Sequence, residues 1–154
     1  MSLQAKLLSL GITLPPVSGP FGAYVPARRV GNLIYVAGQL PMKDGKLMAI
    51  GQVPSRTSLD DARLAAQQCV VNAIAAVQMI GPGAVDSIAG VVRVGAFVSS
   101  DTNFTEQPKV ADAASELLTQ LFGDAGKHAR AAVGVNTLPR DASVEIEVIF
   151  EARN

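Results

Sequence analysis

The stretch HARAAVGVNTLPRDASVEIEVIFEA, residues 128–152, contains three charged side chains that could perform chemistry: Arg130, Glu145 and Glu147. A guanidinium can hold a carboxylate through two parallel hydrogen bonds, which a Lys cannot reproduce. A positioned Glu can pass protons between water and a bound substrate. On residue type alone, these side chains belong either to a solvated strand face or to a site that they line.

Alternation with a period of two predicts a strand in each half of this stretch. The later strand has an apolar face, formed by Val144, Ile146, Val148 and Phe150. Its second face carries the carboxylates Glu145, Glu147 and Glu151. In the earlier strand the alternation separates two sets: Ala131, Val133 and Val135 on one side, and Arg130, Ala132 and Gly134 on the other. We expect Arg130 and Glu145 to share the sheet face that is turned away from the core.

Length and charge limit the class of protein. A chain of 154 residues corresponds to one domain, which can bury roughly two-thirds of the surface that the unfolded chain exposes. Charged residues make up 17% of the chain, against about 25% in average soluble proteins. We therefore expect part of the surface to be buried by other copies of the chain. Lys and Arg number 13, as do Asp and Glu, so nucleic acid is an unlikely partner.

The rarer residue types exclude several kinds of site. Cys69 is the single cysteine and His128 the single histidine. One chain therefore has no disulfide framework and too few ligands for a Cys/His metal site, and we predict no metal and no cofactor. We expect His128 to be structural or exposed and Cys69 to be an inert core residue.

Two apolar stretches bear on localisation. The first 16 residues fit neither a signal peptide nor a transit peptide. Residues 64–85 carry no charge, but they contain polar side chains and a Gly-Pro-Gly break that are typical of a soluble helix. We predict a cytoplasmic protein with no membrane partner.

The remaining elements follow from periodicity and turn residues. We predict helices over residues 3–10, 59–80 and 105–122, and strands over 23–29, 33–40, near 47, 88–98 and in the two halves of the opening stretch, which we expect to form a hairpin-like pair. Ser58 and Asp61 resemble a capping box at the start of the second helix. The order predicts an α+β sandwich with two helices on one face of a sheet. Residues 1–18 form an N-terminal extension, and residues 19–154 form one domain.

Three segments carry a family resemblance: GPFGAYV (19–25), GNLIYVAGQLP (31–41) and ARAAVGVNTLPRDASVEIE (129–147). They closely resemble the Rid family, also called the YjgF or L-PSP-like family. The leader and the helix FTEQPKVADAASELL suggest a side branch. The resemblance implies a chorismate mutase-like fold with a mixed sheet. It also implies a homotrimer whose sheets close into a barrel, with clefts between subunits that hold small carboxylates.

The resemblance also implies a reaction and its residues. The reaction is hydrolysis of enamine or imine intermediates of the 2-aminoacrylate type, which gives a 2-oxo acid and ammonia. The expected catalytic residues are Arg130, which binds the substrate carboxylate, and Glu145, which lies near the substrate nitrogen and the attacking water. Tyr24 is expected to cover the cleft, Gly38 to make a backbone contact, and Ala132 to offer its backbone N–H.

The chain departs from the family pattern at three places. Ala132 stands where many active members have Cys, Ala37 stands where many have Ser, and an Asn common in the second helix is replaced near Pro108. Two further functions therefore stay open beside the deaminase. One is a non-catalytic trimer that binds small carboxylates or metabolites, and the other is a ribonuclease, which the neutral charge balance disfavours.

Overall fold

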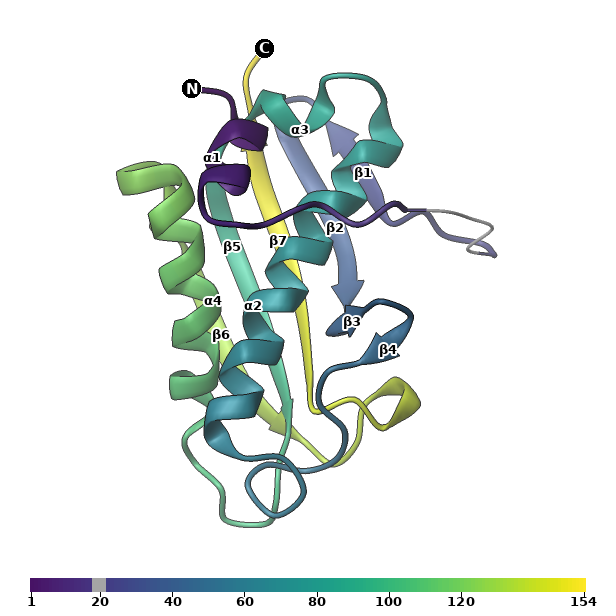
Figure 1. The fold of residues 1–154 in the computed structure, drawn as a ribbon, viewed down its shortest axis with the longest axis vertical. Coiled ribbons are helices and arrows are strands. Elements are labelled where there is room, and N and C mark those ends of the chain that lie inside the picture. Colours follow the sequence, from purple (N-terminus) through teal and green to yellow (C-terminus); the bar gives the residue numbers. More distant parts are fainter. Residues whose placement is uncertain (18–21) are drawn as a thin grey trace.

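The fold was analysed in a computed structural model that describes residues 1–17 and 22–154 (Figure 1). The predicted boundary between residues 18 and 19 lies outside the described residues. The elements follow in this order: α1 (Leu3–Ser9), β1 (Ala27–Val30), β2 (Leu33–Gln39), β3 (Met42–Lys43), β4 (Lys46–Leu47), α2 (Leu59–Ala76), η1 (Val77–Ile80), α3 (Ala84–Ser87), β5 (Ile88–Ser99), α4 (Gln107–Phe122), η2 (Gly123–Gly126), β6 (Ala129–Val135), η3 (Pro139–Asp141) and β7 (Val144–Ala152).

A mixed five-stranded sheet forms one layer, in the order β1-β2-β7-β5-β6, and helices α2 and α4 form the other (Figure 1). Strands β5 and β6 run parallel, whereas the other neighbours are antiparallel. The apolar face predicted for β7 is buried against the helices, with Val144, Ile146, Val148 and Phe150 at most 1% exposed. The predicted α+β sandwich with two helices on one sheet face is confirmed. The trimeric barrel concerns contacts between copies and stays a prediction.

Helix α2 begins as its sequence indicates. The Ser58 side chain accepts a hydrogen bond from the backbone N–H of Asp61 at 3.1 Å, so the expected N-cap is present. Several predicted bounds were too wide, because the regular hydrogen bonding of the element covers only part of the predicted range. The α-helical part of residues 59–80 stops at Ala76 and continues as a 3-10 turn, and α4 starts at Gln107. The predicted strand at 23–29 starts only at Ala27.

The prediction that the last two strands form a hairpin-like pair was wrong. Both pair with β5, with β6 parallel on one side and β7 antiparallel on the other. The connection between them, residues 136–143, contains the turn η3 and carries the chain past β5. This order follows from apolar content: β7 has a fully buried apolar face and occupies the centre of the sheet, whereas β6 is rich in Ala and Gly and occupies the edge.

The prediction of which sheet face the Arg130 side chain occupies was also wrong. Arg130 and Ala132 lie opposite Val94 and Ala96 of β5, which are buried beneath the helices. Cα partners in a sheet share a face, so Arg130 projects on the helix side. Glu145 lies opposite Phe97 on the other face. Arg130 and Glu145 of one chain therefore lie on opposite faces of the sheet.

Both ends of the chain bind to the short helix α3. The backbone N–H of Gln4 donates to Asp86 Oδ1 at 3.2 Å, and the backbone N–H of Arg153 donates to the Ser87 carbonyl at 2.8 Å. The two ends lie side by side at the top of Figure 1. None of the helices in the described ranges has the length and apolar character needed to cross a membrane.

Helix α1 packs into the core of the domain. Leu3 and Leu7 are 6% and 1% exposed and belong to the main apolar cluster, and Lys6 Nζ donates to the Leu121 carbonyl at 3.1 Å. The predicted extension therefore contributes apolar contacts to the layer that it covers.

We predict that Leu7→Ala lowers the free energy of unfolding by about 2–4 kcal/mol, because it removes buried methyl groups and leaves a cavity. Leu8 is the matched control, since it is the next residue of the same helix and is 64% exposed. Leu8→Ala should change stability by less than about 0.5 kcal/mol. Urea denaturation of both variants measures the difference, and equal losses would contradict the packing of α1.

Candidate functional site

Glu145 lies against a bulge in β2, at a glycine that has no side chain. The pairing of β2 with β7 shifts register between Val36 and Gln39, so residues 37 and 38 form a bulge. A Cβ built on Gly38 would lie 2.1 Å from Glu145 Oε1. A side chain at residue 38 would force the Glu145 carboxylate to move. The structure thus places two of the predicted site residues, Gly38 and Glu145, in contact range.

Two causes act on the acidity of Glu145. Burial raises the pKa of its carboxyl above the ordinary Glu value, and the nearby Glu147 carboxylate raises this pKa further. Glu147 itself is held by Arg93, with 3.2 Å between Nη1 and Oε1. A carboxyl group with a raised pKa donates and accepts protons more readily near neutral pH, which suits a general acid/base.

A pocket of about 1230 Å³ is lined by Tyr24, Ala37 and Gly38, the last being the residue against which Glu145 lies, but Glu145 itself is not among the lining residues. The other walls of the pocket are the segment 11–17, helix α2 and the β3–β4 turn. Tyr24 is 61% exposed and also borders a shallower depression with Arg28 and Tyr35. Two predicted ligand-binding residues, Tyr24 and Gly38, therefore line one pocket of the chain.

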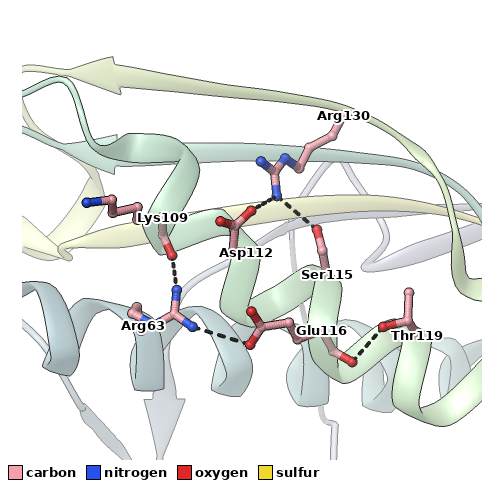
Figure 2. A network of polar contacts seen from close by, with 7 residues as sticks. All are labelled: Arg63, Lys109, Asp112, Ser115, Glu116, Thr119 and Arg130. Atoms are coloured by element: carbon pink, nitrogen blue, oxygen red, sulfur yellow. Dashed lines mark hydrogen bonds and ion pairs between the residues drawn. The ribbon is translucent and has the colours of Figure 1, made fainter.

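Arg130 lies away from this pocket, at the edge of the sheet and against helix α4. Its Nη1 atom donates to Asp112 Oδ1 at 2.8 Å and to Ser115 Oγ at 3.1 Å (Figure 2). The side chain of Arg130 is 23% exposed. Ala132 follows two residues later on the same face and is half-buried. A single chain thus brings Arg130 and Ala132 together but keeps both apart from Glu145, Gly38 and Tyr24.

The sequence analysis missed the partners of Arg130. Asp112 and Ser115 are three residues apart, which places both on one side of a helix, but nothing in their spacing indicates that this side meets β6. His128 was expected to be structural or exposed. Its ring is half-buried, with Nε2 2.9 Å from Ser115 Oγ and Nδ1 2.6 Å from the Gly126 carbonyl oxygen. It therefore belongs to the surroundings of Arg130.

Cys69 is fully buried in the core, as predicted. Burial raises the pKa of its thiol well above the ordinary value, with Glu145 as a smaller cause, so the thiol stays protonated and unreactive. Among residues 1–17 and 22–154, no three His, Cys, Asp or Glu side chains lie close enough together to hold a metal ion.

The layered sheet and its two helices define a protein of the chorismate mutase-like class. A family model described as "YjgF/chorismate mutase-like, putative endoribonuclease" matches residues 4–151. The chain belongs to this YjgF, or Rid, family, as the motifs of the sequence indicate.

Three similar proteins span almost the whole chain. "Protein TCP17" of Trypanosoma cruzi is 37% identical over 153 residues, which cover 99% of this chain and 95% of that protein. A 2-iminobutanoate/2-iminopropanoate deaminase of Dermatophagoides farinae is 34% identical over 90% of this chain and 92% of its own length. The crystal structure of Atu1372 from Agrobacterium tumefaciens, a protein described as having unknown function, has a TM-score of 0.89 and 41% identity, covering 98% of this chain and 92% of that chain. The family therefore includes a protein named as an imine deaminase.

We predict that Glu147→Gln lowers the pKa of Glu145 but leaves it above the ordinary range. The neighbouring charge is the smaller cause of the shift, and burial, the larger cause, remains. Carboxyl ¹³C NMR titration measures the change. Glu151→Gln is the control, because it removes an exposed charge further along the same strand face; a shift as large as that of Glu147→Gln would contradict the assignment.

The same shift has a consequence for stability. A raised pKa means that the folded state binds this proton more tightly than the unfolded state, so the contribution of Glu145 to stability is lost as the pH rises from about 4.3 through the folded-state pKa. Glu145→Gln removes this loss. The variant should gain stability relative to the wild type as the pH rises across that window, and a gap that shrinks would contradict the sign.

Proposed function

We propose that this protein is a hydrolytic deaminase of enamine and imine intermediates of the 2-aminoacrylate type, working in a cleft between the subunits of a homotrimer. The observation that carries the proposal is the Glu145 carboxyl, with its raised pKa, held against Gly38, a residue that lines one pocket together with Tyr24. The relative named 2-iminobutanoate/2-iminopropanoate deaminase, at 34% identity, supports the same chemistry.

The proposed reaction needs no cofactor. An enamine first takes a proton on carbon and becomes an imine. Water then adds to the carbon of the C=N bond, and the resulting carbinolamine expels ammonia to leave a 2-oxo acid. Glu145 removes a proton from the attacking water and returns one to the departing nitrogen. An imine is already electrophilic, so the site contributes mainly by positioning the reactants.

The remaining proposed residues hold the substrate. Arg130 binds the substrate carboxylate through two parallel N–H donors. The backbone N–H of Ala132 and the backbone of Gly38 add further contacts, and the exposed ring of Tyr24 covers the cleft. The substrate is in this way fixed at its carboxylate while Glu145 acts on the neighbouring C=N group.

The division of these residues within one chain supports a shared site. Arg130 and Glu145 lie on opposite faces of the sheet, so both can meet one substrate only if they come from different copies. Strand β6 ends the sheet and carries a single charge, Arg130, which leaves its outer edge open to a partner. Tyr35 and Val133 of the open face are 46% and 44% exposed. Burial of this face and edge in a trimeric barrel would cover these apolar side chains.

A non-catalytic carboxylate-binding trimer is the second candidate. Ala37 lines the pocket and Ala132 follows Arg130, and neither side chain has a polar atom to contribute to turnover. The proposed binding contacts, made by Arg130, Tyr24 and the backbone of Gly38 and Ala132, need no polar side-chain atom at residues 37 and 132. RNA stays the least favoured substrate because of the balanced charge, and the cytoplasmic location stays a prediction.

We predict that the wild type releases 2-oxo acid from an imine generated enzymatically in the assay, and that Glu145→Gln reduces turnover by about 10²- to 10⁴-fold while nearly keeping carboxylate affinity. The amide keeps the shape of the side chain and loses its proton transfer. A coupled assay of 2-oxo acid formation, together with pyruvate titration, measures both quantities.

Glu147→Gln is the internal control for this substitution. Glu147 lies on the same face of β7 as Glu145, about 7 Å further along the strand, and pairs with Arg93. Its substitution should therefore alter turnover far less than Glu145→Gln. Equal losses from the two variants would reject the role given to Glu145. Wild-type protein that binds pyruvate but releases no 2-oxo acid would select the binding function.

We further predict that light scattering finds a trimer and that two inactive variants complement each other. Arg130→Ala should abolish pyruvate binding with little change in thermal stability, and Arg130→Lys should bind weakly. If each site takes Arg130 and Glu145 from different subunits, co-refolding Arg130→Ala with Glu145→Gln in equal amounts restores about a quarter of the sites. A stable monomer, or a mixture with no regained activity, would reject the shared site.

A further inference from the structure

Within residues 1–17 and 22–154, the guanidinium of Arg130 is held through one of its three nitrogens. Nη1 makes both hydrogen bonds, to Asp112 and to Ser115, and in the described part of the chain neither Nε nor Nη2 donates to any group. The Nε and Nη2 hydrogens project from one edge of the planar group, the edge that forms two parallel bonds with a carboxylate. The anchored atom and the open edge are thus different parts of the same side chain.

With a neutral His128 ring, the hydrogen bonds behind Arg130 can run in one direction only. The Gly126 carbonyl oxygen can only accept, so His128 Nδ1 carries the proton in the 2.6 Å contact between them. In the neutral ring Nε2 is then an acceptor, and it lies 2.9 Å from Ser115 Oγ. The Ser115 hydroxyl therefore donates to His128, which leaves its oxygen lone pairs for Arg130 Nη1. Each hydrogen bond from Arg130 Nη1 back to the Gly126 carbonyl oxygen then joins one donor to one acceptor.

The hydrogen bonds behind Arg130 end at the backbone of Gly126, which packs closely against α4. A Cβ on Gly126 would lie 2.5 Å from the Leu118 carbonyl oxygen and 2.8 Å from Thr119 Cα. The backbone of residue 126 consequently packs directly on helix α4, the helix that also supplies Asp112 and Ser115. Both attachments of the Arg130 anchor thus belong to α4 and the turn after it.

The other carboxylate of α4, Glu116, forms an ion pair with a different arginine. Arg63 of α2 pairs with Glu116 at 3.3 Å and donates to the Lys109 carbonyl oxygen (Figure 2). Asp112 is therefore the carboxylate of α4 that contacts Arg130. An ion pair alone would allow the guanidinium to rotate and offer Asp112 its bidentate edge, whereas the hydroxyl of Ser115 on the same Nη1 atom favours one orientation.

We infer that Ser115 and His128 are positioning residues, which hold Nη1 of Arg130 so that its Nε and Nη2 edge faces the substrate carboxylate. The inference rests on the proposed function, because it concerns the ligand of that same site. It assigns a role to the single histidine of the chain without contact between its ring and the substrate.

Two substitutions of the same shape test the role of the hydroxyl. Ser115→Val and Ser115→Thr introduce side chains of equal size and branching, but only Thr keeps the hydroxyl. Calorimetric titration with pyruvate should show affinity about 10-fold weaker for Ser115→Val and largely restored for Ser115→Thr, since a hydrogen bond to a charged group is lost in the first. In turnover, the loss should appear in KM more than in kcat.

Thr119→Val supplies the matched control. Thr119 lies one turn further along α4, and its hydroxyl donates to the Glu116 carbonyl oxygen at 2.9 Å without touching Arg130 (Figure 2). This variant should bind pyruvate as the wild type does. Thermal melting of all three variants separates a binding effect from a loss of folding.

A measurement without ligand tests the anchor itself. In ¹⁵N NMR, His128 should show the Nδ1-protonated tautomer, and the Nη signals of Arg130 should be resolved in the wild type and averaged by rotation in Ser115→Val. An Nε2-protonated ring, or equal Arg130 spectra in the two proteins, would overturn the inference.

The binding results separate this inference from the proposed function. If the wild type binds pyruvate through Arg130 but Ser115→Val and Ser115→Thr bind it equally well, the positioning role is wrong and the proposed function stands. If Arg130→Ala binds pyruvate as well as the wild type, the proposed site is wrong and the ligand role of its anchor is overturned with it.

Discussion

The parallel pairing of β6 with β5 is the contact on which the arrangement of the site depends. It sets the register that places Arg130 opposite the buried Val94, and so it directs the guanidinium toward helix α4. It also leaves β6 at the edge of the sheet. With β6 in the antiparallel position next to β7, Arg130 would have other neighbours and the carboxylate of Asp112 would lose its partner. One strand pairing thus determines both which groups surround Arg130 and where a partner can approach it.

The sheet keeps the charges of Arg130 and Glu145 within one chain apart. The cation lies on the helix side, where Asp112 neutralises it, and the carboxylates Glu145 and Glu147 lie on the opposite face. An Arg next to Glu145 within the same chain would favour the charged carboxylate and lower its pKa. Separation by a layer of sheet keeps the Arg130 charge of the same chain from lowering this pKa. The partial burial of Glu145 against Gly38 also raises this pKa. It does so at some cost in stability, because burying a carboxylate is unfavourable.

Much of this fold could be predicted because its central elements carry strong patterns. The alternation from Val144 to Phe150 identified a strand with one buried face, and Ser58 identified the start of α2. The facing of β6 could not be predicted in the same way. Its residues are mostly Ala, Gly and Val, so the alternation contains little contrast between core and surface. Pairing between distant strands decided the outcome, and the hairpin expected from sequence proximity was wrong for the same reason.

Residues of the candidate site could be predicted from the sequence where they belong to a motif. They could not be predicted where only packing in three dimensions brings them together. Gly38 and Glu145 lie far apart in the sequence, and the bulge that brings them together has no signal beyond the glycine itself. The surroundings of Arg130 are of the second kind: nothing in the sequence links His128 to Ser115, because the turn at Gly126 brings them together. Whether the distant residues form one site stays a prediction.

The attachment of both chain ends to α3 makes the molecule suitable for circular permutation. Gln4 and Arg153 bind neighbouring residues of this helix, so a short flexible linker could join these two segments without crossing the sheet or the pocket. New ends could then be opened in a surface loop, and a reporter domain inserted there would sit at a chosen distance from the β6 edge. The order of strands along the chain would change while their neighbours in the sheet stayed the same.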